Sequence, residues 1–202
     1  NATSVRDRDD LYETAIDPDR IEAYRGRIED LYDRRSEPAI AAPLARATAE
    51  TIHANGKGDR RDRIEPLLDR LETVYEAHSE PDVAASLLRA YAHAELYLDA
   101  DVEGEESDAP FGRDDAADGG DTSPRTDARG DRVVRAEELF RAHPDGEVAA
   151  GLAGVLAGRT NADAKRTDVH AIEERIGRIE ALADRYPAQE ESIVRWLPVA
   201  TA

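Results

Sequence analysis

The sequence predicts an all-α protein: a right-handed α-solenoid of about four antiparallel helical hairpins, with a period of about 43 residues and one acidic disordered insertion. Three observations predict this fold class. Apolar residues recur at helical spacings of three and four along most of the 202-residue chain. A Ser-Glu-Pro turn occurs at residues 36–38 and again at residues 79–81. The residues that end the first helix of each hairpin are separated by 43, 65 and 43 positions, and they are Arg35, His78, His143 and Tyr186.

The first predicted helix begins after Asp17. Its side chain can cap the free N–H groups of a helix start, and Pro18 occupies the first position, where a missing N–H does no harm. We expect the helix to end at the turn of residues 35–38. Between these limits the apolar residues form one stripe, which consists of Ile21, Tyr24, Ile28, Leu31 and Tyr32.

The second predicted helix follows this turn and is expected to end at Asn55-Gly56, because glycine readily takes the left-handed conformation that stops a helix. The later hairpins align with the first through corresponding apolar positions. After Tyr186-Pro187 the register of the last hairpin is ambiguous. The aligned residues are Ile28, Leu71, Ala136 and Ile179 on the first helices, and Leu44, Leu87 and Leu152 on the second helices.

An acidic insertion at residues 101–131 accounts for the one longer spacing between hairpins. The segment contains 11 acidic and 3 basic residues, five glycines and two prolines. It is predicted to be flexible, because it buries too little apolar surface to offset the entropy of ordering. The chain is therefore divided into an N-terminal tail (1–16), helical repeats 1–2 (17–100), the insertion (101–131) and helical repeats 3–4 (132–202).

The stretch from Ile64-Glu65-Pro66-Leu67-Leu68 to Ser79-Glu80-Pro81-Asp82-Val83-Ala84 resembles a HEAT repeat. It is similar to that family in the early proline of the first helix, in the Asp-Val entry to the second, and in repeat length. The segment 143–150 is similar. Where the family carries an arginine after the valine, this chain has Ala84 and Ala149. TPR-like hairpins are the competing family, but neither their repeat of about 34 residues nor the position of their prolines fits this chain. Either resemblance implies a protein-binding scaffold.

The charge balance indicates the solvent in which the protein works. Acidic residues outnumber basic ones by 45 to 27, which gives a net charge of −18, and only two of the basic residues are lysines. This composition resembles that of cytosolic proteins from salt-accumulating halophiles, so we expect a cytoplasmic location. No apolar run approaches the roughly 20 residues of a membrane-spanning helix. Nucleic-acid binding is disfavoured, because no cluster of basic residues is free of interleaved acids.

The sequence contains no pattern that identifies catalytic residues, a cofactor or a metal site. Cysteine is absent, which excludes disulfides and thiolate chemistry. The segment Gly56-Lys57-Gly58 lacks the remaining residues of a phosphate-binding loop. The five histidines do not have the spacing of metal ligands. Carboxylates are so numerous that no pair stands out as a general acid and base. We therefore expect a protein that is not an enzyme.

Two features are candidate partner-binding sites. Arg46 and Arg89 are related by the 43-residue spacing, and His53 and His93 lie further along the same two helices, so the four could form a basic track. The alternative is that the arginines pair with nearby glutamates such as Glu50 and Glu95. The second feature is Trp196, in the apolar stretch 193–200. It either folds back onto the preceding hairpin or docks on another chain.

The predicted function is a non-catalytic protein–protein interaction scaffold or adaptor, a monomer or weak oligomer that binds a protein partner. Repeat hairpins suit this role because they present a long surface whose exposed residues can vary without disturbing the core. Two alternatives remain open. One is a small-ligand-binding or enzymatic helical domain, and the other is an acidic regulator that binds a basic protein.

Overall fold

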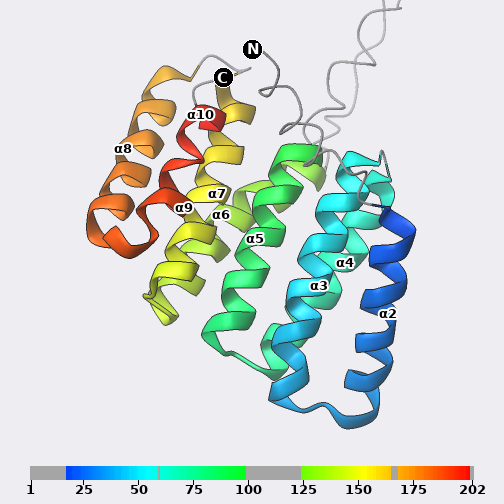
Figure 1. Ribbon diagram of the computed structural model, residues 1–202. Helices are drawn as coiled ribbons and strands as arrows, with labels where there is room; N and C mark the ends of the chain where they lie inside the picture. The colour runs from blue at the N-terminus through cyan, green and yellow to red at the C-terminus, as the bar shows by residue number, and fades with distance from the viewer. Residues whose placement is uncertain (1–16, 59, 99–123, 165–167, 201–202) are drawn as a thin grey trace, which may run out of the picture.

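The computed structural model describes residues 17–58, 60–98, 124–164 and 168–200, and these form an all-α fold without a strand, as predicted. Helices α3, α5 and α7 stand side by side in one row, with α4 and α6 behind them, α2 beside α3 and α8 beside α7 (Figure 1). In chain order the helices are α2 (Pro18–Arg35), α3 (Pro38–Lys57), η1 (Arg61–Arg63), α4 (Ile64–Ala77), α5 (Pro81–Leu98), α6 (Pro124–Ala142), α7 (Gly146–Ala164), α8 (Val169–Arg185), η3 (Pro187–Gln189), α9 (Glu190–Val194) and α10 (Leu197–Ala200).

The predicted limits of α2 are confirmed. The Asp17 side chain accepts a hydrogen bond from the Asp19 N–H at 3.0 Å, and Pro18 occupies the first turn. At the other end Ser36 takes a left-handed conformation, with φ of 46°, and its N–H donates to the Tyr32 carbonyl. A free helix-end carbonyl is satisfied in this way before α3 begins.

The predicted end of α3 at Asn55-Gly56 is wrong. Both residues lie inside the helix and are buried, and α3 continues to Lys57, with Gly58 at its C-cap. Gly56 is needed for a close contact instead: a Cβ at this position would lie 2.1 Å from Cδ2 of Tyr97 on α5. The glycine therefore allows α3 and α5 to approach each other.

The predicted insertion of residues 101–131 lies mostly outside the described residues. Its last part, 124–131, belongs to α6, which begins at Pro124. Proline is well tolerated in the first turn of a helix, because the N–H that it lacks has no helical partner there. The predicted tail, 1–16, also lies outside the described residues.

The core lies between the row of α3, α5 and α7 and the helices that cover it. Three glycines of α7 allow it to lie close to α5, because a Cβ at each would be within 3 Å of an α5 side chain: Gly151 at Leu88, Gly154 at Ala92 and Gly158 at Glu95. The largest fully buried apolar side chains come from nearly every long helix and include Leu44, Ile52, Ile64, Leu71, Leu87, Leu88, Leu139, Leu156, Ile179 and Ile193.

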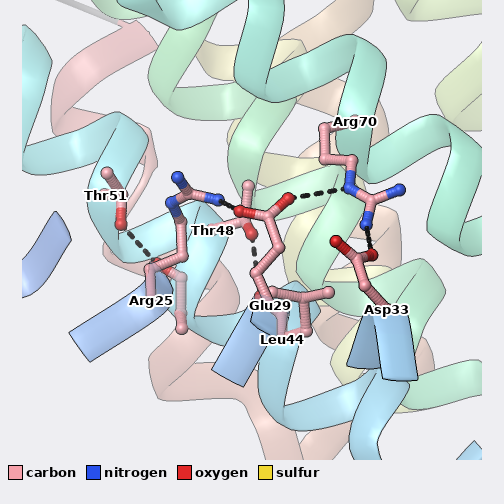
Figure 2. A network of polar contacts seen from close by, with 8 residues as sticks. Arg25, Glu29, Asp33, Leu44, Thr48, Thr51 and Arg70 are labelled. Carbon is pink, nitrogen blue, oxygen red and sulfur yellow. Dashed lines mark hydrogen bonds and ion pairs between the residues drawn. The ribbon is translucent and has the colours of Figure 1, made fainter. Parts of the chain in front are cut away.

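The helices outside the row, α2, α4, α6 and α8, are called the outer helices, and they are joined by ion pairs. Figure 2 shows Arg70 of α4 between two acids of α2, with its Nε 2.9 Å from Glu29 and its Nη2 2.5 Å from Asp33, while Arg25 also binds Glu29. Equivalent contacts join α4 to α6 and α6 to α8. These are Glu72–Arg135 at 3.6 Å and Glu137–Arg178 at 2.6 Å. The three glutamates are spaced by 43 and then 65 positions, and their arginine partners by 65 and then 43 positions.

Ring contacts join the ends of the same helices. His78 lies edge-on to Tyr32, with ring centroids 5.6 Å apart. The other two edge-on pairs are Tyr75–His143, at 6.0 Å, and Phe140–Tyr186, at 6.1 Å. His78, His143 and Tyr186 directly follow α4, α6 and α8, and they are three of the four residues from which the sequence spacing is measured.

Among the described residues, which end at 200, no long helix follows α8. After Tyr186 the chain forms η3, α9 and α10, which pack against α7 and α8. Ile193 and Ala200 are buried there. The C-terminal segment therefore covers the side of α7 and α8 that a further helix of the row would occupy.

Candidate interaction surface

The arginines of the predicted basic track lie next to acidic side chains. Arg89 of α5 lies between Glu50 of α3 and Glu147 of α7, with a nitrogen 3.9 Å from an oxygen of each. Arg46 of α3 is exposed and lines a groove to which Glu50 and Asp82 also contribute. Acidic oxygens this close offset much of the positive charge. Arg89 therefore pairs with the neighbouring Glu50, which is the alternative that the sequence analysis gave for it.

Glu95, the second acid considered as an arginine partner, lies at the other end of α5 and is buried. Its carboxylate accepts a hydrogen bond at 3.3 Å from Arg132 of α6, which also binds Glu65 of α4. A buried charge needs such a partner, because desolvation otherwise costs more than folding can supply. This ion cluster joins α4, α5 and α6. Arg132 and Glu95 are buried, whereas the Glu65 side chain is 55% exposed.

The two predicted histidines meet. Together with Tyr97 they form what we call the imidazole cluster: His53 from α3, and His93 and Tyr97 from α5. The imidazole centroids are 4.4 Å apart, and the tyrosine ring lies 5.8 Å from His53 and 6.5 Å from His93. The Tyr97 hydroxyl and Nδ1 of His53 are hydrogen-bonded at 3.0 Å. His93 and Tyr97 share a helix face because they are four residues apart.

Burial and neighbouring cations keep the imidazoles neutral. Burial lowers the pKa of His93 to about 3, with a further contribution from His53. Burial also lowers the pKa of His53, where Lys57 acts in the same direction and Glu50 opposes it. Both rings are therefore neutral near pH 7 and act as hydrogen-bonding groups. The cations that also lower the pKa of His93 are Arg89, Arg195 and Lys57.

The imidazole cluster can bind through its polar atoms and its ring edges. Nδ1 of His93 is buried and has no hydrogen-bond partner among the described residues. Burial raises the pKa of Tyr97, so its hydroxyl keeps its proton at neutral pH. Within the described ranges, no group of three or more His, Asp or Glu residues is placed to hold a metal ion. Tyr97 and the two imidazoles offer hydrogen-bonding groups and aromatic rings.

Trp196 folds back onto α7, which is one of the two alternatives expected for it. A Cβ at Gly154 would lie 2.9 Å from Cε2 of the indole, and the Arg195 guanidinium lies 5.6 Å from the indole ring centroid. The ring is half-buried. A Cβ at Gly154 would also lie 2.9 Å from Cβ of Ala92, which precedes His93 on α5, so the C-terminal segment reaches the neighbourhood of the imidazole cluster.

A concave surface lies near the start of the described chain. It has a volume of about 780 Å³, and we call it the α2–α3 groove. Tyr24 on its wall is 62% exposed. Its apolar lining is Ile21, Tyr24, Ala42, Pro43 and Ala47, and its polar lining is Arg20, Arg46, Glu50 and Asp82.

The predicted site residues fall into three places. His53 and His93 lie together with Arg89 near them, Arg46 lies in the α2–α3 groove, and Trp196 lies on α7, apart from the groove. Tyr97 was not among the predicted residues, although its position four residues after His93 is a usable signal. The groove was not predicted either.

No protein-family model, curated protein or solved structure matches the chain. The HEAT-like or TPR-like resemblance thus stays a prediction. None of the helices in the described part of the chain has the length and apolarity needed to cross a membrane.

Proposed function

We propose that this chain is a non-catalytic protein–protein interaction scaffold built from HEAT-like helical repeats. The observation that carries the proposal is the recurrence of inter-helix contacts. Each long outer helix is joined to the next by an ion pair at the same relative position, as in Glu29–Arg70 and Glu137–Arg178. A bundle of unrelated helices has no reason to repeat such pairs at the same spacings as its turns.

The repeated contacts between helices favour a protein-binding role over an enzymatic one. In a stack of repeats each unit packs only on its neighbours, so the core is made locally and the exposed face is free to vary. The arrangement that the contacts support is a period of 43 residues, with an insertion between the second and third units. The function itself rests on the exposed surface and not on the fold alone.

The proposed binding face is formed by α3 and α5 around the imidazole cluster. Aromatic side chains and arginine are enriched where proteins bind one another, and this face combines Tyr97 and two neutral imidazoles with Arg89. His53 and Tyr97 are partly exposed, so their side chains can contact a partner. We further propose a salt-rich cytoplasm as the working environment, because salt screens the repulsion that a net charge of −18 would otherwise cause within the folded protein.

Site-specific crosslinking tests the proposal. The chain has no cysteine, so His53→Cys or Arg89→Cys gives a single attachment point for a photoactivatable group. Exposed Thr73, on α4, provides the matched control position Thr73→Cys. In a high-salt lysate we expect one protein to be crosslinked from positions 53 and 89 and not from position 73. Equal crosslinking from all three positions, or none from any, would contradict the proposal.

A further inference from the structure

The α2–α3 groove is made of residues whose counterparts elsewhere are covered. Tyr24 is 62% exposed, whereas Leu67, one repeat length later in the sequence, is 9% exposed. Pro43 is exposed, and its counterpart Ser86 is buried. Ile21 and Ala42 are half-buried, and their counterparts Ile64 and Ala85 are buried, whereas Ala47 is buried like its counterpart Ala90. On the proposed repeat arrangement, the groove is the uncovered end of the row.

The counterparts show what kind of element covers such a surface. On α7 the corresponding face contains Gly151 and Gly154, which touch Leu88 and Ala92 of α5. On α5 it contains Arg89 and His93, whose partners on α3 are Glu50 and His53. Thus α3 covers this face of α5, and α5 covers this face of α7. In each case the covering helix is the preceding helix of the row. The corresponding face of α3 contains Pro43, Arg46 and Glu50, and all three line the groove.

We propose that residues 1–16 of this chain occupy the α2–α3 groove, in the place that α3 takes on α5. This inference rests on the repeat arrangement of the proposed function. The segment directly precedes Asp17, so it enters beside Ile21 and Tyr24 on the first turns of α2. It brings Val5, Leu11, Tyr12 and Ile16 as apolar residues for an apolar groove.

Charge complementarity sets the register of the occupant. Glu50 lies 3.9 Å from Arg89 and, one repeat earlier, the corresponding residues are Asp7 and Arg46. Arg89 also contacts Glu147, whose counterpart Asp82 lines the groove near Arg46. In the proposed position Arg46 lies between Asp7 and Asp82, as Arg89 lies between its two acids.

Cysteine accessibility in the full chain tests this placement. Pro43→Cys reports on the groove, and Ala77→Cys, at the exposed end of α4, is the reference. We expect Pro43→Cys to react with a maleimide about tenfold more slowly than the reference, because reaction requires the segment to leave. Leu11→Asp combined with Tyr12→Asp should remove this protection without changing the reference rate.

A charge exchange tests the register. Asp7→Arg should reduce the protection of position 43, and the added change Arg46→Asp should restore it, at the lowest salt that keeps the helical circular dichroism unchanged. Fast reaction of Pro43→Cys in the otherwise unchanged chain would overturn the proposal. Protection that rises with protein concentration and survives the changes at Leu11 and Tyr12 would also overturn it, since it identifies a second copy in the groove. These outcomes are independent of crosslinking from position 53, which tests the proposed function.

Discussion

The Arg132 guanidinium donates a hydrogen bond to the Glu95 carboxylate at 3.3 Å, and both side chains are buried. On the proposed repeat arrangement Glu95 is the counterpart of Ile52, and Arg132 is the counterpart of Leu67, so an ion pair takes the place of two apolar core residues. The pair joins α5 to α6 across residues 99–123. It fixes which faces of the two helices meet at the one junction where the spacing is longer.

Removing one partner of this pair should destabilise the protein strongly. Glu95→Ala takes a carboxylate away from a buried guanidinium, which keeps its contact with Glu65, and we expect a loss of about 3 kcal/mol in the free energy of unfolding. The double change Glu95→Leu with Arg132→Leu removes both charges and should cost far less than Glu95→Ala alone. Urea unfolding followed by circular dichroism gives both values. Glu138→Ala, at an exposed acid of α6, is the control and should change stability by less than about 1 kcal/mol.

Gly56 and Gly26 should respond in opposite ways to the same substitution. Gly56→Ala places a methyl group 2.1 Å from the Tyr97 ring, and overpacking of this kind costs about 1–3 kcal/mol. A Cβ at Gly26, within α2, would meet no atom within 4 Å, so Gly26→Ala should stabilise by about 0.5–1 kcal/mol through helix propensity. The difference in urea midpoint between the two variants measures the contact. Equal effects would show that α3 and α5 do not meet at Tyr97.

His93 should make stability depend on pH below neutrality. The unfolded chain takes up a proton at His93 near its ordinary pKa of 6.5, whereas the folded chain does so only near pH 3. The stability contribution is therefore complete above pH 6.5 and falls as the pH drops toward 3, by about 2 kcal/mol at pH 5.

The variant His93→Gln isolates this effect, because all other titrating groups are shared. Between pH 7 and pH 5, the wild type should lose about 2 kcal/mol more unfolding free energy than the variant. His170→Gln, at an exposed position of α8, is the matched control and should follow the wild type. A His93→Gln curve parallel to the wild-type curve would mean that His93 is accessible to protons in the folded state.

The helices could be predicted from the sequence because their signals are local. The cap at Asp17 and the spacing of apolar residues depend only on neighbouring positions. The end of α3 could not be predicted, because the signal at Gly56 reports a contact with Tyr97 on another helix. The sequence alone does not distinguish a glycine that allows close packing from a glycine that ends a helix.

The candidate site was predictable only in part. The 43-residue spacing of Arg46 and Arg89 predicts that their two helices, which also contain His53 and His93, are neighbours, but only the structure shows that Tyr97 completes the contact. The pairing of Arg89 with Glu50 depends on side-chain positions that spacing leaves open. The α2–α3 groove could have been predicted from the sequence. The 43-residue spacing relates Tyr24 to Leu67, and no predicted helix precedes the first hairpin to cover Tyr24.

A deletion of one repeat length should leave a folded protein if the chain is a stack of repeats. Removing residues 46–88 deletes one whole period and joins Ala45 to Arg89 within one continuous helix. Glu29 then takes the position of Glu72 opposite Arg135. We expect retained helical circular dichroism and a cooperative unfolding transition, at lower stability because one unit and one junction are lost.

A deletion shorter by two residues is the matched control. Removing residues 46–86 joins Ala45 to Leu87, and the two extra residues turn the following helix by about 200°, since an α-helix has about 3.6 residues per turn. The apolar face of the joined helix then points away from α2, so this variant should lose its cooperative transition. If the two deletions unfold alike, the recurring ion pairs reflect coincidence, because a true repeat tolerates only the loss of a whole period.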